Sequence, residues 1–271
     1  MKLLKWVGSK EFVADQILSL LPSKCRAFHE RMCGSAVVGM KMRAAGRAQG
    51  LYLSDTNEEL INVFRQVQKH PLMVQAYLRV LALEYNRVQE PKDVYAAWVH
   101  ERNLVREFVT SRDAARTIAI NRMCFNGLYR TNQKGGFNAP WGKRPKLELR
   151  ALGDAIAEAS LRLQGAIISV EPVLDSLKFA PDDVVFLDPP YDGTFASYGP
   201  TKWGDEELQQ IAAYARKVSR LCPVFVCNSD TTKVRAAFEG STFHEISGRS
   251  IVSQKTRSRG PRKELLIEVK P

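Results

Sequence analysis

The chain has 271 residues, of which 45% are hydrophobic, so it can bury a substantial core in one large domain or in a domain with a sizeable insertion. Its apolar runs are far shorter than the ~20 residues that a membrane helix needs, and the amino-terminal stretch "MKLLKWVGSK" lacks the apolar region of a signal peptide. The five cysteines include no C-x-x-C pair, which argues against a disulfide framework and a zinc cluster. These features predict a globular cytoplasmic protein without a membrane segment.

The formal net charge of +11 is concentrated in two segments. Residues 112–150 carry nine Lys or Arg against two acids, and residues 249–263 carry six and no acid. Such a concentration suits a polyanion such as nucleic acid, because neutralising phosphates releases their counterions. Two solvated loops are the alternative interpretation of the charge alone.

The amino-terminal part of the chain has the pattern of a unit that builds a parallel sheet. Its spacing predicts a helix, a strand, a glycine-containing loop with a second helix, and a second strand, over residues 10–21, 25–30, 36–47 and 51–55. Residues 58–122 then have helical spacing and predict an inserted helical region.

A different pattern follows the helical region. Asn, Gly and Pro interrupt residues 121–145 repeatedly, which predicts a long ordered loop or hairpin, and loops of that length are usually functional. The remaining elements are a helix from 147, strands over 165–170 and 183–188, a helix over 205–220, a strand over 223–230, a short helix after Thr231, and strands over 242–247 and 264–269. Together they predict an α/β fold with a mixed sheet.

The stretch "VVFLDPPY" places polar and rigid residues directly after a buried strand. In an open α/β sheet, ligands bind outside the carboxyl ends of the strands, so Asp188 is expected to face a crevice. Pro189 and Pro190 lack N–H donors and fix two φ angles, which leaves carbonyl acceptors in a stiff arrangement. With Tyr191 as a stacking ring, this set suits a planar heterocycle that bears an amino group. An ordinary Asp-Pro turn is the alternative.

Several stretches in a fixed order resemble the Dam-type DNA adenine-N6 methyltransferases. "DPPY" resembles the catalytic motif of methyltransferases that act on amino groups in DNA. "LKWVGSK", "FHERMCGSAV" and "LSDTNEELINVF" are similar to motifs in the amino-terminal part of that family, and "CNSD" and "RSIVSQKTRSRGPRKELLI" fit its ending. "NRMCFNGLYRTNQKGGFNAPWG" is the most specific match. Ser9, Arg31 and Ala36 depart from the residues usual in the family.

The resemblance implies a Rossmann-like methyltransferase fold with a mixed, mostly parallel sheet. It implies that 1–56 and 147–271 form the catalytic domain that binds S-adenosylmethionine, and that 57–146 form a helical target-recognition region with a basic loop. No metal is expected. The residues that it places at the cofactor are Trp6, Lys10, Glu30, Cys33, Gly34, Ser35, Asp55 and Asp188.

Each of these assignments has a structural alternative. The loop from Glu30 to Ala36 contains small residues that let the backbone approach a ligand. Asp55 ends a strand, where an acid accepts bonds from ribose hydroxyls, and the resemblance favours this role; a cap for the helix that begins near Asn57 is the alternative. Without the resemblance, Trp6 would be interpreted as a core residue.

The activity implied is transfer of a methyl group to adenine N6 in double-stranded DNA, with GATC as the expected site by analogy. Asp188, Pro189, Pro190 and Tyr191 are the expected catalytic residues, and the target base would be flipped out of the duplex. The basic loop would bind the duplex. Its expected DNA-binding residues are Arg122, Asn126, Tyr129, Arg130, Asn132, Lys134, Lys143 and Arg144.

Other activities fit the residues less well. A cytosine-C5 methyltransferase needs a nucleophilic cysteine, usually after proline, and no Pro-Cys occurs; the zinc deaminase signature is also absent. A metal-dependent nuclease would need Asp188 together with the distant Glu268, and that spacing is loose. Two alternatives stay open: an amino-group methyltransferase that acts on RNA, and a catalytically silent DNA-binding protein. No obligate protein partner is evident.

Overall fold

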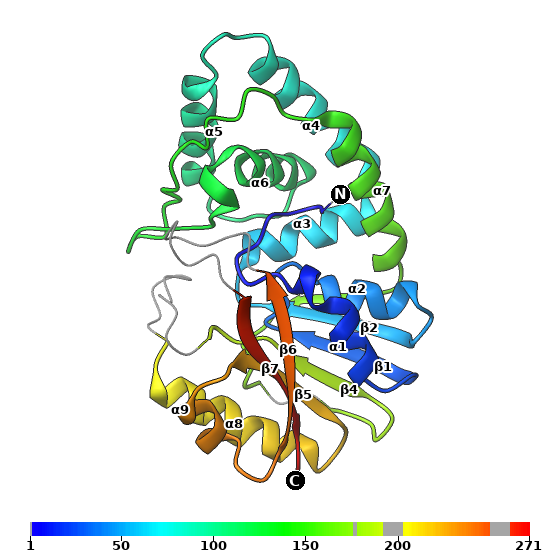
Figure 1. Cartoon of the computed structure of the whole chain (residues 1–271). Helices are drawn as coiled ribbons and strands as arrows, with labels where there is room; N and C mark the ends of the chain where they lie inside the picture. Colours follow the sequence, from blue (N-terminus) through cyan, green and yellow to red (C-terminus); the bar gives the residue numbers. More distant parts are fainter. Residues whose placement is uncertain (1, 176–177, 192–202, 250–260) are drawn as a thin grey trace. The chain divides into compact units, whose positions relative to one another are not determined.

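A computed structural model describes residues 2–175, 178–191, 203–249 and 261–271 (Figure 1). The chain divides into two compact units, which we describe separately. Among the described residues, the sheet unit comprises 8–56, 165–175, 178–191, 203–249 and 261–271, and the helical unit comprises 2–7 and 57–164.

The sheet unit is built on a sheet of seven strands in the part of the chain that the structure describes. The strands are β1 (Cys25–Arg31), β2 (Ala48–Asp55), β3 (Ile167–Val170), β4 (Val184–Leu187), β5 (Val224–Ser229), β6 (Thr242–Arg249) and β7 (Pro261–Val269). Their order is β3-β2-β1-β4-β5-β7-β6; β1 to β5 pair in parallel, and β7 runs antiparallel to both neighbours. This confirms the expected α/β fold with a mixed, mostly parallel sheet, in the Rossmann order with β7 inserted.

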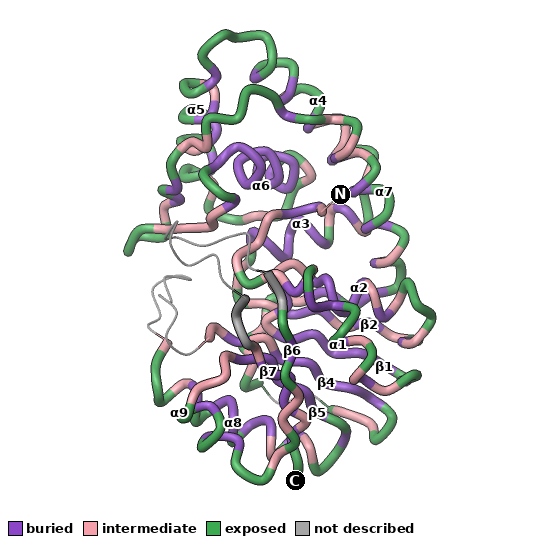
Figure 2. Tube along the Cα trace, viewed as in Figure 1, coloured by how far each residue is buried: buried purple, intermediate pink, exposed green. Residues whose placement is uncertain are grey.

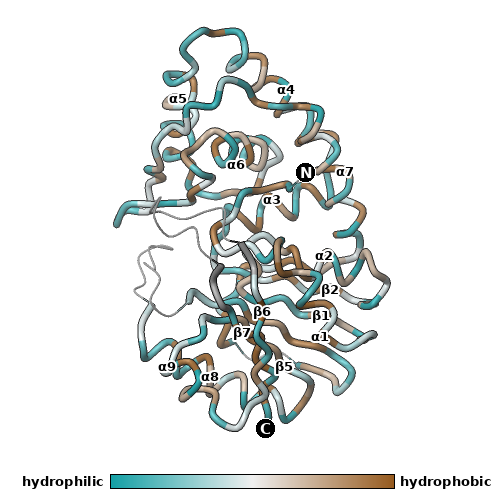
Figure 3. The backbone as a smooth tube through the Cα atoms, in the orientation of Figure 1, coloured by the Kyte–Doolittle hydropathy of each residue, from teal (hydrophilic) through white to brown (hydrophobic). Residues whose placement is uncertain are grey.

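Helices cover both faces of this sheet. They are the 3-10 turn η1 (Lys10–Phe12), α1 (Ala14–Leu20), α2 (Val37–Ala44), α8 (Asp205–Ser219) and α9 (Thr232–Ala237). Successive side chains of a strand point to opposite faces; accordingly Glu30 of β1 bonds to α2, and Arg31 bonds to α8. The central strands β4 and β5 are therefore buried, as their purple colour in Figure 2 shows, and β5 is hydrophobic in Figure 3.

The helical unit is organised around α6. Its elements are α3 (Glu58–Lys69), α4 (Pro71–Asn86), α5 (Lys92–Leu104), α6 (Ser111–Met123), the turn η2 (Phe125–Gly127) and α7 (Leu149–Leu163). A capping box between Thr110 and Asp113 starts α6, which is buried from Asp113 onward and contacts α3, α4 and α5 (Figure 2). Its alanines, Ala114, Ala115 and Ala119, leave room for these neighbours.

The boundaries differ from expectation at several points. The helix expected over 10–21 is interrupted between η1 and α1, and β2 starts at Ala48, earlier than expected. The helical unit also extends beyond 57–146, because α7 packs its apolar face on α3 and α4. The first residues join it too, since Asn121 bonds to both backbone groups of Lys5.

Candidate active site

Asp188 follows β4 at the carboxyl edge of the parallel strands. Its Oδ1 lies 2.7 Å from Nζ of Lys10, a buried lysine that also donates to the carbonyl of Gly8 at 2.6 Å. Burial raises the pKa of Asp188 to about 6, although Lys10 opposes this rise; Glu264 adds to it. Burial disfavours the charged form of Lys10, but the Asp188 carboxylate nevertheless raises the pKa of this lysine. The site therefore holds an ion pair at neutral pH.

Tyr191 lies beside this ion pair. The Lys10 ammonium is 4.7 Å from the centre of its ring, and its hydroxyl donates to Oε2 of Glu264 at 2.8 Å. Burial raises the pKa of Tyr191 far above its ordinary value, so the hydroxyl stays a donor. Between Asp188 and Tyr191, Pro189 is buried and Pro190 is half-buried. The structure thus brings the residues of the expected catalytic motif together with Lys10.

The loop between β1 and α2 contains three residues with left-handed backbone conformation. Met32, Gly34 and Ala36 have φ angles of +57°, +47° and +51°, so alternate residues of the loop are left-handed. The Gly34 amide donates to Oδ2 of Asp55 at 3.1 Å, which ties the loop to the end of β2. Such a loop presents backbone groups at the carboxyl ends of adjacent strands, where cofactors bind in this fold.

Other expected cofactor residues in this loop have contacts of their own. The Cys33 side chain is buried, and Ser35 donates its hydroxyl to Ser9 at 2.9 Å. Glu30 accepts the Gly39 amide of α2 at 2.7 Å, and burial raises the pKa of Glu30 to about 8. Glu30 therefore supports the first turn of α2; its role toward a cofactor stays a prediction.

Asp55 is not the cap of α3. The side chain of Asn57 accepts the Leu60 amide at 3.0 Å and caps that helix instead. This removes the structural alternative for Asp55, whose carboxylate lies at the end of β2 and bonds to the β1–α2 loop. Ribose binding by Asp55 remains a proposal.

Arg31, which departs from the family pattern, is buried and makes three hydrogen bonds. Its guanidinium donates to Tyr214 Oη at 2.7 Å, to the carbonyl of Asp175 at 2.9 Å and to that of Pro172 at 2.6 Å. It thereby fastens the segment that follows β3 to the end of β1 and to α8. The substitution therefore adds a structural link next to the expected cofactor loop.

In the helical unit, Trp6 and Tyr129 pack against each other with ring centroids 5.3 Å apart. The Tyr129 hydroxyl donates to Oε2 of the buried Glu59 at 2.9 Å, and Arg102 donates to both groups. Arg102 also donates to the Gly135 carbonyl at 2.9 Å. This network holds the loop after α6 in place, so Tyr129 has a structural role; contact of Trp6 with a cofactor stays a prediction.

Arg122 lies inside the helical unit and is 6% exposed. Its Nε and Nη2 have no hydrogen-bond partner among the described residues. Burial lowers the pKa of Arg122 to about 10. Burial lowers the pKa of Lys5 as well, and the positive charges of Arg144 and Arg122 lower it further. The three side chains thus form a cationic cluster, and Lys5 is a member that the sequence had not singled out.

The other expected DNA-binding residues are exposed or half-buried. Arg130 is held by hydrogen bonds to Asn138, and Asn132 accepts the amides of Lys134 and Gly136, which closes a turn. Bridges between Cys124 and Trp141 and between Thr131 and Phe137 give this segment a hairpin form. Asn126, Lys134, Lys143 and Arg144 are exposed.

Phe125 was missed by the sequence reasoning. It is 50% exposed at the start of η2, next to Asn126, whose φ angle is +53°. An aromatic residue held at an exposed turn beside basic residues suits insertion into a base stack. The signal in the sequence was its place before Asn-Gly, which is typical of a tight turn.

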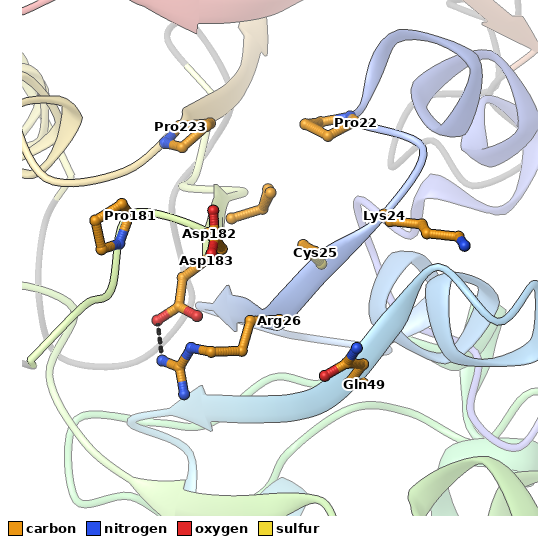
Figure 4. Close-up of a pocket in the computed structure, with 10 residues that line it drawn as sticks. Pro22, Lys24, Cys25, Arg26, Gln49, Pro181, Asp182, Asp183 and Pro223 are labelled. Carbon is orange, nitrogen blue, oxygen red and sulfur yellow. Dashed lines mark hydrogen bonds and ion pairs between the residues drawn. The ribbon is translucent and has the colours of Figure 1, made fainter.

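Several features lie outside this site or outside the described residues. A hollow of about 470 Å³ lies at the amino ends of β1 and β4, where Asp183 bonds to Arg26, so it is on the edge opposite to Asp188 (Figure 4). Most of the second basic segment, 250–260, lies outside the described residues. Within the described ranges, no helix is long and apolar enough to cross a membrane, and no cluster of three metal-binding side chains occurs.

Comparisons with known proteins show which family this chain resembles. Residues 6–252 match the model of the family described as D12 class N6 adenine-specific DNA methyltransferase. The Retron Ec67 DNA adenine methylase of Escherichia coli is 29% identical over 91% of this chain and 84% of its own length. The DNA adenine methylase of Vibrio cholerae is 28% identical over 99% of this chain and 95% of its own. The type II methyltransferase M1.LlaDCHI of Lactococcus lactis is 26% identical over 97% and 93%. This chain therefore belongs to the D12 class N6 adenine-specific DNA methyltransferase family.

Proposed function

We propose that this protein transfers a methyl group from S-adenosylmethionine to N6 of an adenine in double-stranded DNA, and that Asp188, Pro189, Pro190 and Tyr191 form the catalytic site. The observation that carries the proposal is the placement of Asp188 at the carboxyl end of β4, ionised beside Lys10 and next to the Tyr191 ring. Family membership makes adenine in DNA the acceptor class.

The cofactor would lie along the carboxyl edge of β1 and β2. The Cys33–Ser35 stretch and the carboxylate of Asp55 would hold it, since this loop lies at the carboxyl ends of β1 and β2, where cofactors bind in this fold, and Gly34 bonds to Asp55. When bound, S-adenosylmethionine supplies an electrophilic methyl group on a positively charged sulfur. Lys10, Glu30 and Trp6 complete the proposed cofactor set, Lys10 through its contact with Asp188.

The target amino group would be held by two acceptors. A carboxylate oxygen of Asp188 and the Pro189 carbonyl would each accept one N–H, which directs the nitrogen lone pair at the methyl carbon. The adenine ring would stack on the Tyr191 ring, on the face of the tyrosine that is opposite Lys10. Most of the rate enhancement would come from alignment, with the reacting atoms about 3 to 3.5 Å apart.

Because N6 lies inside the duplex, the adenine would be flipped into the site at a cost of a few kcal/mol. The helical unit would be the target-recognition part and the sheet unit the catalytic part. Phosphates would bind the cationic cluster of Lys5, Arg122 and Arg144, since two guanidinium nitrogens of the buried Arg122 have no hydrogen-bond partner among the described residues. Phe125 would fill the gap left by the flipped base.

The remaining proposed contacts to DNA lie on the loop after α6. They are Asn126, Tyr129, Arg130, Asn132, Lys134 and Lys143. GATC is the proposed site, on the resemblance to Dam-type enzymes. Since its substrate is DNA, we place the protein in the cytoplasm of a bacterial or phage-infected cell.

The test is incubation of the purified protein with methyl-labelled S-adenosylmethionine and unmethylated plasmid DNA, followed by nucleoside analysis and mapping of the label. We expect label in N6-methyladenine at one short sequence, and no label with Asp188→Ala, which should keep its affinity for DNA. Label in RNA instead of DNA would identify RNA as the acceptor of the methyl group. Absence of transfer to either nucleic acid, with cofactor binding also absent, would favour a silent DNA-binding protein.

A further inference from the structure

Glu264 lies at the edge of the sheet that carries Asp188, although it belongs to a distant part of the chain. It pairs with Ser229 of β5 and with Ile246 of β6. Because β7 runs antiparallel to β5, the beginning of β7 lies beside the carboxyl end of β5. Tyr191 comes three residues after Asp188, which follows the neighbouring strand β4, and so can reach Glu264.

The ring of Tyr191 is held at two points. Its hydroxyl donates to Oε2 of Glu264 at 2.8 Å, and the ammonium of Lys10 lies 4.7 Å from the ring centre. The same ammonium is 2.7 Å from Oδ1 of Asp188. Asp188, Lys10, Tyr191 and Glu264 therefore form one connected set, in which a single cation lies close to two carboxylates among the described side chains.

We propose that Glu264 is a positioning residue for methyl transfer: it holds the Tyr191 ring in the orientation on which the target adenine stacks, beside the Lys10–Asp188 pair. This inference rests on the proposed function. Glu264 acts through Tyr191 and Asp188 and is not itself expected to touch the substrate.

The two effects of Glu264 can be separated by substitution. Tyr191→Phe removes the hydrogen bond and keeps both the ring and the carboxylate. Glu264→Gln keeps an oxygen that accepts the tyrosine hydroxyl but removes the charge. Glu264→Leu removes the bond and the charge together. Glu268→Leu is the matched control, since Glu268 lies on the same face of β7 and is paired with Lys270, away from Asp188.

The charge effect has a defined sign. Two charged groups shift the pKa of Asp188: Lys10 lowers it and Glu264 raises it. Three further titratable groups interact electrostatically with Asp188, namely Tyr191, Glu30 and Cys227. Transfer requires ionised Asp188, so activity falls as the pH drops through the pKa of this carboxyl. Removing the negative charge of Glu264 lowers that pKa, and the acid limb of the pH profile should therefore move to lower pH.

The experiment measures single-turnover methylation at saturating cofactor across pH, together with the fluorescence of 2-aminopurine placed at the mapped target adenine. We expect Tyr191→Phe and Glu264→Leu each to slow transfer roughly tenfold, as for loss of a hydrogen bond to a charged group. The double variant should be no slower than either single one. The aminopurine signal should change in both singles, because stacking on the ring changes.

At pH 8, Glu264→Gln should transfer the methyl group at a rate within about twofold of the wild type, and the acid limb of its pH profile should lie at lower pH. Glu268→Leu should match the wild type in both respects. Additive effects of Tyr191→Phe and Glu264→Leu, or an unshifted limb in Glu264→Gln, would overturn the inference while wild-type transfer stands. Absence of transfer by the wild type would instead overturn the proposed function and this inference with it. If Glu264→Leu lowers the melting temperature so far that its activity cannot be measured, the rate of Tyr191→Phe and the pH profile of Glu264→Gln still test the inference.

Discussion

Nζ of Lys10 lies 2.7 Å from Oδ1 of Asp188, and both side chains belong to the sheet unit. The pair links the 3-10 turn that follows the amino-terminal segment to the end of β4, and it stands beside the Tyr191 ring. Since burial alone would favour the neutral carboxyl group, the lysine is what keeps the Asp188 carboxylate ionised near neutral pH.

The pH profile of methylation should reflect this ion pair. With the pKa of Asp188 at about 6, activity should be full above that pH and fall below it. Lys10→Met removes the opposing cation, so the pKa of Asp188 should rise and the acid limb should move to higher pH. Lys233→Met, which breaks the exposed pair with Asp205, is the control and should leave the profile unchanged. An acid limb that stays in place in Lys10→Met would contradict the assignment.

Arg31→Met should destabilise the sheet unit and weaken cofactor binding. It leaves two backbone carbonyls and Tyr214 without their donor, at a cost of about 2 to 4 kcal/mol in the free energy of unfolding. Tyr214→Phe removes one acceptor only, so its cost should be smaller. Urea unfolding and calorimetric titration of S-adenosylmethionine measure both effects; unchanged affinity in a folded Arg31→Met would limit this residue to a stabilising role.

Arg122→Met should separate stability from DNA binding. Removing a buried guanidinium, two nitrogens of which have no partner in the described part of the chain, should leave the free protein as stable as before or more stable. The affinity of the variant for duplex DNA should nevertheless fall. The slope of the logarithm of the association constant against the logarithm of the salt concentration should become shallower by about 0.9. Arg112→Met, on the exposed start of α6, is the control and should keep the slope. A loss of stability without a change in slope would assign Arg122 to the core.

Gly142 is a position where the backbone approaches closely. A Cβ there would lie 2.5 Å from the carbonyl oxygen of Cys124 and 2.8 Å from that of Met123, which are backbone atoms and cannot turn aside. Gly142→Ala should therefore displace the loop after α6, cost about 1 to 3 kcal/mol and weaken DNA binding. Gly153→Ala in α7 meets no atom within 4 Å and should be neutral or slightly stabilising. Thermal unfolding of the two variants distinguishes these outcomes.

Sequence patterns were sufficient for the fold and the family. Apolar runs followed by polar residues predicted the strands, and Asp188 was expected at a carboxyl end because the run before it is wholly apolar. Helix boundaries were less well predicted: the spacing over 10–21 is continuous, yet the helix is interrupted between η1 and α1.

Contacts between distant segments could not be read from local patterns. Glu264 was seen only as part of a strand, because its meaning depends on the antiparallel direction of β7 and on its place beside β5. Arg122 was counted with the basic loop, although burial is decided by the packing of α6 against its neighbours. Arg31 was noted only as a departure from the family pattern, because its three acceptors lie in distant parts of the chain.

The position of β7 also has a consequence for how the chain folds. In the sheet, β6 pairs with β7 alone among the described strands, so the earlier strand has no place on the sheet until the later one has docked on β5. Since Glu264 lies on β7, the acceptor of the Tyr191 hydroxyl is in place only once β7 is docked on β5.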